Sequence, residues 1–254
     1  MMTAGRSRVA GLVFAALAMG ASGPLRAEPR ELRYLGYAVE QGSGRYLYTE
    51  VHRHQYDGAR WLGGSIRYVA PDGRELAERQ LDFRTDPYVP LMRYRLAGDV
   101  EEEAITAIGP SVVQLEQRTG TQVRRVTLPR RSRQAADSGF NAYLVDQLDN
   151  LAAGREVTLS MIVLGRLDQY RFRVLPAGRL TVAGEPALRL RIVPDSLLRL
   201  LVDPLEVIYG LRSRQLLHYH GPSNLLDPAS GRSYAVDIDY RRRPSSAPAI
   251  LPEP

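Results

Sequence analysis

The 254-residue chain contains no cysteine and no lysine. Without cysteine it forms no disulfides, offers no thiolate to a metal and cannot carry a lipid on an N-terminal cysteine. A secreted domain of this length can still fold, because its core is large enough without covalent cross-links. All 34 basic residues are arginine, which is typical of a GC-rich coding sequence and by itself predicts no function.

The sequence has one long, nearly continuous apolar run, and it lies close to the N-terminus. Arg6 and Arg8 precede the apolar segment 9–21, and the small and helix-breaking residues of GASGPLRA follow it. The run is too short to cross a bilayer, and this order of charged, apolar and small residues is typical of a secretory signal peptide. We therefore expect cleavage after Ala27 and a periplasmic mature chain with no transmembrane span.

Charge is modest once the signal peptide (1–27) is set aside. Its three arginines account for half of the formal net charge of +6, so the mature chain carries +3. That excess is too small to predict binding of nucleic acid. The remaining length suits one β-rich domain, which we place at residues 28–240. The proline-rich tail at 241–254 is expected to be disordered.

Alternation with a period of two residues runs through the mature chain. Tyr170, Phe172 and Val174 alternate with Arg171 and Arg173, and similar patterns occupy 45–54, 187–193 and 233–240. Glycine-containing turn signals such as PDG, TG and DPASG separate these segments. Such a pattern is typical of antiparallel strands that are buried on one face, and it predicts about ten or eleven of them.

One helix is expected among these strands. In the segment 139–152, Leu144 and Leu148 recur at helical spacing, Ser138 can cap the start, and Gly154 ends the run. A shorter helical piece is predicted within 195–206. The fold class that follows is mainly β: a single large curved antiparallel sheet, an open half-barrel, with one main helix on its concave face.

Three blocks carry a resemblance to known proteins: YVAPDGRELAERQLDF (68–83), SGFNAYLVDQLDNLAAGREVTLSMIV (138–163) and LLHYHGPSNLLDPASGRSYAVDIDY (216–240). With them the chain resembles a family of secreted proteobacterial proteins that has no assigned activity. It is more distantly similar to the periplasmic lipoprotein-carrier superfamily, whose open half-barrel holds acyl chains under a helical lid. Those carriers usually begin with a helix, whereas a strand is predicted here at 32–39. The resemblance brings no catalytic residues.

The four histidines form two pairs with the same spacing, His52 with His54 and His218 with His220. Residues i and i+2 of a strand point to the same side, so each pair could grip one metal ion. Aromatic residues and arginines surround both pairs, and only Glu50 offers a carboxylate on the matching face to orient a ligand. We therefore predict no metal site and keep a metal-dependent hydrolase as the alternative function.

Other polar motifs have ordinary structural interpretations. Ser223 follows Gly-Pro and lies near a histidine, but no GxSxG turn accompanies it, so a turn residue is favoured over a nucleophile. Asp237 and Asp239 are predicted on the solvated face of a strand rather than at a calcium ion. Five arginines, at positions 124, 125, 130, 131 and 133, form a basic stretch that could meet lipid headgroups, although a solvated loop is favoured.

These patterns predict a binding or chaperone-like protein without enzymatic activity or cofactor. The space between the helix and the sheet could hold a lipid or acyl ligand, and an envelope protein is a further candidate partner. The other alternative is a structural envelope factor without a ligand, because the same side chains would also make an ordinary core. The candidate ligand-lining residues are large and apolar: Tyr46, Tyr48, Leu144, Leu148, Met161, Tyr170 and Phe172.

Overall fold

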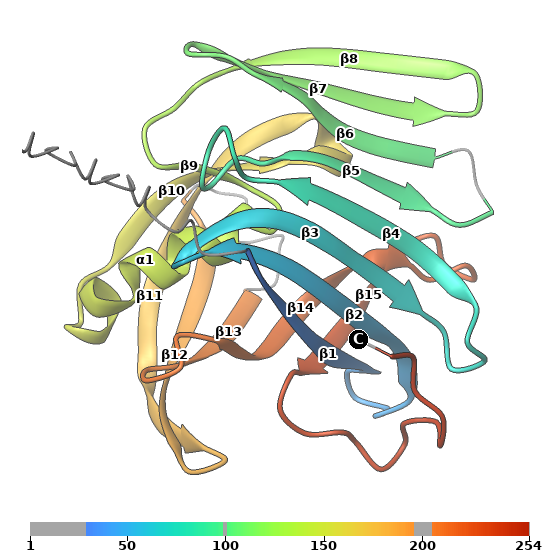
Figure 1. Ribbon diagram of the computed structural model, residues 1–254, viewed down its shortest axis with the longest axis vertical. Helices are drawn as coiled ribbons and strands as arrows, with labels where there is room; N and C mark the ends of the chain where they lie inside the picture. Colours follow the sequence, from blue (N-terminus) through green and yellow to red (C-terminus); the bar gives the residue numbers. More distant parts are fainter. Residues whose placement is uncertain (1–28, 99–100, 196–204, 254) are drawn as a thin grey trace, which may run out of the picture.

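The computed structural model describes residues 29–98, 101–195 and 205–253. These ranges contain fifteen strands, one α-helix and one 3-10 turn (Figure 1). The elements in chain order are β1 (Arg30–Glu40), β2 (Tyr46–Asp57), β3 (Arg60–Val69), β4 (Glu75–Asp82), β5 (Leu91–Leu96), β6 (Glu101–Ile108), β7 (Val112–Thr119), β8 (Gln122–Pro129), β9 (Gln134–Ala136), α1 (Gly139–Ala152), β10 (Val157–Val163), η1 (Leu164–Arg166), β11 (Asp168–Val182), β12 (Glu185–Pro194), β13 (Leu205–Gly210), β14 (Leu216–Leu226) and β15 (Ser233–Asp239).

All described strands belong to one sheet, in the order β8-β7-β6-β5-β4-β3-β2-β1-β15-β14-β13-β12-β11-β10-β9. Neighbouring strands are antiparallel except for β9 and β10, which are parallel. The chain thus forms two meanders, joined where β1 pairs with β15. The predicted class, a large curved sheet with one helix, is confirmed. The sheet is mixed rather than purely antiparallel and has more strands than expected.

The sheet is rolled, so that its two ends overlap. Successive side chains of β10 point to opposite faces. Leu159 belongs to the apolar cluster that contains α1, whereas Ile162 belongs to the cluster built mainly from β1–β8. Leu164 of η1 joins that second cluster with Ile105 of β6 and Leu128 of β8. Strands β6–β8 therefore cover one side of β10, and α1 covers the other.

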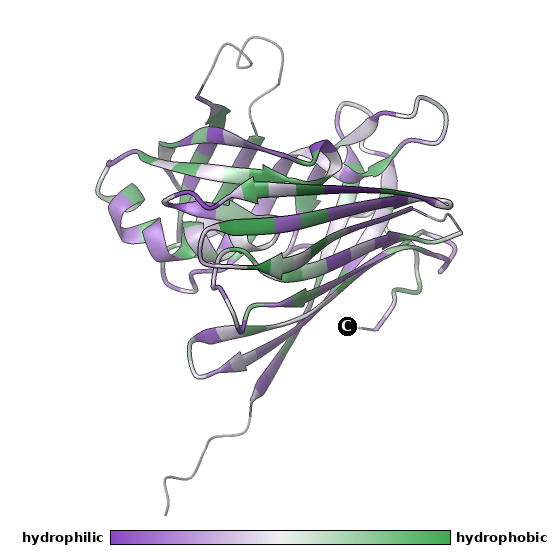
Figure 2. Cartoon of the chain, turned by 90° about the horizontal axis from the view of Figure 1, so that it is seen from above, coloured by the Kyte–Doolittle hydropathy of each residue, from purple (hydrophilic) through white to green (hydrophobic). Residues whose placement is uncertain are grey.

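Helix α1 lies on the concave side of the sheet, at the left of Figure 1. Leu144, Leu148 and Leu151 are buried in one cluster with inward-facing residues of β12 and β13 such as Leu190 and Tyr209. The apolar stripe of the helix thus supplies much of the core of this half, as its spacing predicted. Figure 2 shows the matching alternation of polar and apolar residues along the strands.

The ends of α1 differ in part from the sequence-based expectation. Ser138 is the N-cap residue, but its side chain makes no capping hydrogen bond and instead donates to Asp137 Oδ1 at 2.7 Å. Gly154 ends the helix as predicted, with φ +81° and its N–H bonded to the Leu151 carbonyl oxygen. A positive φ at this position favours glycine because it has no Cβ.

The remaining expectations have mixed outcomes. The predicted helical piece at 195–206 lies mostly outside the described residues, and its last two residues begin strand β13. Residues 241–253 contain no helix or strand. Among the described residues, no helix is long and apolar enough to span a membrane.

Candidate functional site: the polar and aromatic interior

The two histidine pairs lie on opposite faces of the sheet. His52 and His54 share the inward face of β2 with Tyr48, which is buried in the core. His218 and His220 of β14 flank Tyr219, which packs inward, so the two histidines face outward. Strands β1 and β15 also separate β2 from β14 in the sheet. The four imidazoles therefore cannot converge on one metal ion, and no three His, Asp or Glu groups of the described ranges form a metal site.

The inner pair belongs to a buried chain of hydrogen bonds. His52 Nε2 lies 2.9 Å from Glu50 Oε2, and His52 Nδ1 lies 3.3 Å from His54 Nε2. The Tyr240 hydroxyl donates to the same Glu50 oxygen at 2.9 Å. Tyr34 stacks on the His52 ring with a centroid distance of 4.3 Å. These polar atoms satisfy one another inside the protein, which explains why they can be buried.

Burial also controls the protonation of His54. It lowers the pKa of this imidazole well below 6.5, and the neighbouring His52 adds to the shift. Tyr34 and Trp61 pack on the His54 ring from β1 and β3, and of the two histidines it is His52 that is bonded to Glu50. Thus His54 is neutral in the folded protein at neutral pH, because its surroundings cannot compensate a positive charge.

Stability should therefore fall as the pH drops below about 6.5, where an unfolded histidine takes up a proton and folded His54 does not. The part of the free energy of unfolding that arises from the lowered pKa of His54 is fully present above about pH 6.5 and is lost progressively below it. In His54→Phe the aromatic contacts remain but the titrating group is gone, so the free energy of unfolding should decrease less steeply between neutral and mildly acidic pH. Urea denaturation across this range checks the slope, and identical slopes for the two proteins would contradict the assignment.

The outer pair shares a carboxylate instead of a metal. Asp237 Oδ1 lies 2.8 Å from His220 Nδ1 and 3.2 Å from His218 Nε2, and Gln41 Nε2 lies 3.2 Å from His220 Nδ1. All three acidic and imidazole side chains are partly exposed to solvent. Asp237 is thus on the solvated face of its strand, as predicted, and it bridges two histidines of the neighbouring strand.

The Gly-Pro-Ser-Asn segment was predicted to form a turn, but it lies within strand β14, with Ser223 facing the interior. Ser223 is buried, and its hydroxyl oxygen lies 2.7 Å from the Tyr48 hydroxyl and accepts the Leu225 N–H at 3.0 Å. The Tyr94 hydroxyl of β5 donates to the Asn224 carbonyl oxygen at 3.1 Å. The segment therefore ties β14 to strands β2 and β5 of the first half of the sheet, and Ser223 has a structural role.

A buried ion pair that the sequence reading missed lies in the centre of the molecule. Arg79 Nη1 of β4 lies 3.1 Å from Asp137 Oδ1, directly before α1. The guanidinium also sits 5.0 Å from the Tyr94 ring centroid and 5.7 Å from that of Tyr68. Burial by itself would lower the pKa of Arg79, but the Asp137 carboxylate and the phenols raise it overall, so the group stays charged. Its Nε atom has no hydrogen-bond partner.

The signal for this pair was the alternation around Arg79. Arg79 occupies an odd-numbered position in an alternating segment whose other odd-numbered residues are apolar and buried: Ala77, Leu81 and Phe83. The alternation therefore placed an arginine on the apolar face of this strand. A charged residue at such a position is normally paired when it is buried. The sequence gives a weaker indication that Asp137 is the partner, because aspartate is common before a helix as a capping residue.

The seven candidate ligand-lining residues separate into two groups. Tyr48 is in the core with its hydroxyl bonded to Ser223, and Tyr46 OH lies 2.7 Å from Thr49 Oγ1. The other five lie together around α1. Leu144 and Leu148 of the helix are buried, Met161 and Phe172 are half-buried against the same cluster, and Tyr170 pairs with Met161 across β10 and β11. The structure thus brings five of the residues to one place.

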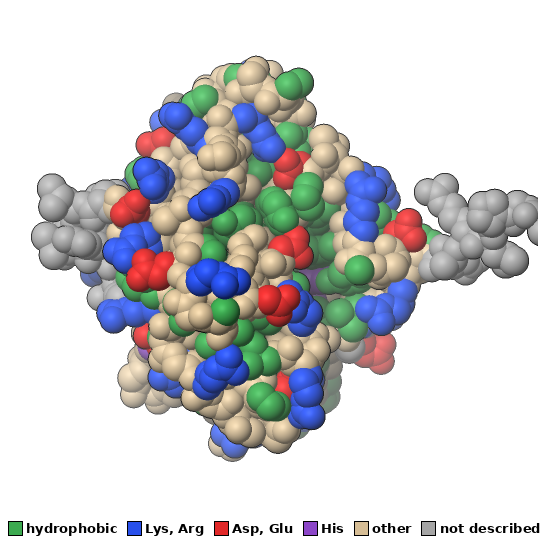
Figure 3. Space-filling model, turned by 90° about the vertical axis from the view of Figure 1, so that its left-hand side faces the viewer, with side chains coloured by type: hydrophobic (Ala, Val, Ile, Leu, Met, Phe, Trp, Pro, Cys, Tyr) green, Lys and Arg blue, Asp and Glu red, His purple; other side chains and the backbone are tan. Residues whose placement is uncertain are grey.

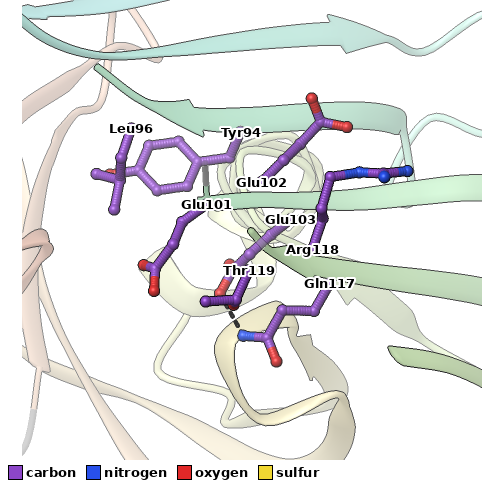
Figure 4. A pocket seen from close by; sticks show the side chains of 8 residues that line it. All are labelled: Tyr94, Leu96, Glu101, Glu102, Glu103, Gln117, Arg118 and Thr119. Carbon is purple, nitrogen blue, oxygen red and sulfur yellow. Dashed lines mark hydrogen bonds between the residues drawn. The ribbon is translucent and has the colours of Figure 1, made fainter. Parts of the chain in front are cut away.

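A small hollow between β5, β6 and β7 has a volume of about 30 Å³, which suits no more than a few water molecules. Figure 4 shows the Glu103 side chain directed toward Gln117, whose Nε2 donates to its carboxylate at 3.3 Å. Burial raises the pKa of Glu103. The hollow is too small and too polar for an acyl chain. Its lining residues are Tyr94, Leu96, Glu101, Glu102, Glu103, Gln117, Arg118 and Thr119.

Comparison with known proteins places this rolled sheet among β-barrel-like proteins. No family model and no curated protein matches the chain. Among solved structures, it is similar to a β-barrel-like protein of the Domain of Unknown Function DUF1849 from Brucella abortus, with a TM-score of 0.52 and 8% sequence identity. The match covers 84% of this chain and 97% of the Brucella protein. At this identity the similarity shows a shared fold and does not extend to activity.

Proposed function

We propose that the chain is a periplasmic binding protein without enzymatic activity that holds a lipid or acyl ligand on the concave side of its sheet, beside α1. The proposal rests mainly on the half-buried apolar side chains there. Met161 and Phe172 come from neighbouring strands and pack against the cluster of α1 while keeping part of their surface accessible. A flexible thioether and an aromatic ring suit an apolar ligand of variable shape.

The surface on this side of the molecule supports the same proposal. Figure 3 views the side that carries α1, β9, β10 and β11, and shows apolar side chains gathered in a depression with carboxylates and arginines around it. Exposed apolar patches with a polar border are typical of binding sites. The polar groups that could have suggested an enzyme, Ser223 and the inner histidines, are bonded to other protein groups in the core.

Native mass spectrometry of protein recovered from the periplasm tests export and ligand together. We expect a mass that corresponds to a chain beginning at Glu28, with a co-purified lipid that is released on denaturation. A chain with an intact Met1 would contradict the proposed export. If the chain begins at Glu28 but carries no bound lipid, ligand binding at the apolar site is decided by the fatty-acid titration described next.

Titration of delipidated protein with a fluorescent fatty acid measures the site directly. We expect saturable binding that Phe172→Asp weakens strongly, because a carboxylate on the apolar face must stay solvated. Thr181→Asp is the matched control: it adds the same charge to the same strand at an exposed position and should leave binding unchanged. Absence of saturable binding to the unmodified protein, or equal binding by both variants, would reject the proposed site.

A further inference from the structure

The sheet has one open edge, formed by β8. Strand β8 is the last strand on its side and pairs only with β7. Figure 1 shows it at the top. Only its last residue is engaged on the outer side, where the Pro129 carbonyl oxygen accepts from Gln134 Nε2 at 3.3 Å and from Gln169 Nε2 at 3.1 Å. The opposite end of the sheet is different: β9 has only three residues, and the Tyr88 carbonyl oxygen accepts the Ala136 N–H at 2.9 Å. The rest of β8, up to Leu128, is long enough to take another strand.

The register identifies the backbone groups that face outward. Thr119 and Gln122 close a two-residue turn in which Gly120 has φ +60°. The closing pair of such a hairpin exchanges both hydrogen bonds, and every second pair along an antiparallel ladder repeats this arrangement. Residues 124, 126 and 128 therefore bond to β7. The N–H and C=O groups of Val123, Arg125 and Thr127 point to the open side, where no backbone group of the described residues pairs with them.

The open edge is positively charged. Arg124 and Arg125 are both exposed, and so is Arg131 just after the strand. Arg125 Nε donates to Glu116 at 2.9 Å, but no ion pair or hydrogen bond joins Arg124 or Arg131 to another side chain of the described ranges. Two copies of the chain that paired along β8 would bring their arginine pairs together, and like charges on adjacent strands destabilise the pairing. A second copy is therefore a poor occupant.

We infer that the edge of β8 binds an extended acidic segment of a partner polypeptide as an added strand. Backbone hydrogen bonds to Val123, Arg125 and Thr127 would supply affinity, and the unpaired guanidinium groups would select glutamate or aspartate on the incoming strand. The chain's own C-terminal segment does not meet this description, because Arg241, Arg242 and Arg243 make it basic. This inference is independent of the proposed apolar site, which lies beside α1.

The test uses a fluorescently labelled peptide of alternating glutamate and valine and the full-length processed protein. We expect saturable binding that high salt weakens, and no binding of the matching lysine–valine peptide. Thr127→Pro removes one outward N–H without removing a bond to β7, because proline is tolerated on the free side of an edge strand. It should weaken binding about tenfold, which corresponds to the loss of roughly one hydrogen bond. Thr127→Val changes only the side chain and should bind as the unmodified protein does.

Several outcomes would overturn the inference. Equal binding of the acidic and basic peptides would remove the charge selection, and equal binding by Thr127→Pro and Thr127→Val would exclude strand addition. Self-association that Thr127→Pro abolishes would show that a second copy occupies the edge. If Thr127→Pro does not fold, as judged by its melting curve, Arg124→Glu replaces it, because this variant leaves the backbone unchanged. Undiminished binding of the acidic peptide by Arg124→Glu would then reject the inference.

Discussion

Replacing Arg79 by methionine should reduce the free energy of unfolding by about 3–5 kcal/mol, the usual cost of removing one partner of a buried ion pair. The loss arises because the Asp137 carboxylate is left with only 11% of its side-chain surface exposed and without its cation. Asp137 would keep only the neutral donors of Ser138, whose hydroxyl lies 2.7 Å away. Urea denaturation measures the change.

The double variant Arg79→Met/Asp137→Asn should recover part of this loss, because it removes the second charge as well. Asn suits position 137, where φ is +48°, since asparagine tolerates the left-handed region better than most residues. Arg95→Met is the control: Arg95 pairs with Glu78 at 3.4 Å on the exposed face, so its removal should cost less than about 1 kcal/mol. If Arg79→Met proved as stable as the control, or the double variant no better than the single one, the pair would not stabilise the interior.

The location of this pair shows what it does for the fold. Strand β4 belongs to the first meander, whereas Asp137 lies between β9 and α1 at the beginning of the second. The ion pair therefore links the sheet to the start of the helix across the concave face. Tyr88 reinforces this link, since its hydroxyl donates to Asp146 of α1 at 2.7 Å. We expect Arg79 to fix where α1 begins, and so to position the apolar face of the helix beside β10.

Sequence alternation identifies most strands because it reports which side chains share a face. It works well for β11, where Phe172 and Val174 alternate with arginines. It fails for β9, which has three residues and owes its existence to the parallel partner β10. It is also weak for β6, whose sequence begins with three glutamates. The predicted number of strands was therefore too low, because short or highly charged segments such as β9 and β6 become strands only through pairing with distant parts of the chain.

The rolling of the sheet could not be read from alternation, because the pattern does not say which element covers a face. One local signal existed in β10. Its sequence, VTLSMIV, is apolar at Leu159 on one side and at Ile162 on the other, as expected for a strand covered on both faces. For the same reason, the sequence could not show that the two histidine pairs lie on opposite faces of the sheet. Equal spacing within each pair shows a shared face, but the faces of β2 and β14 can be compared only in the folded sheet.

The packing of α1 allows an equally direct test. Replacing Leu148 by alanine should reduce the free energy of unfolding by about 2–5 kcal/mol, because the site loses apolar burial and retains a cavity. Leu148 is 1% exposed, lies one turn from the fully buried Leu144, and belongs to a cluster with strands β10 to β13. The neighbouring Asp149→Ala is the matched control, since its carboxylate is 85% exposed and only pairs with Arg214 at the surface.

Chemical denaturation distinguishes two roles of the helix. If α1 is part of the core, Leu148→Ala lowers the unfolding midpoint while Asp149→Ala does not, and the whole sheet unfolds together with the helix. If α1 instead were a lid that detaches easily from the sheet, Leu148→Ala would leave the midpoint of the sheet unchanged and would affect only signals from the helix. The polar links from Tyr209 to Asn141 and from Arg214 to the Val145 carbonyl oxygen favour the first result, because they anchor the first half of α1 to the β13–β14 hairpin.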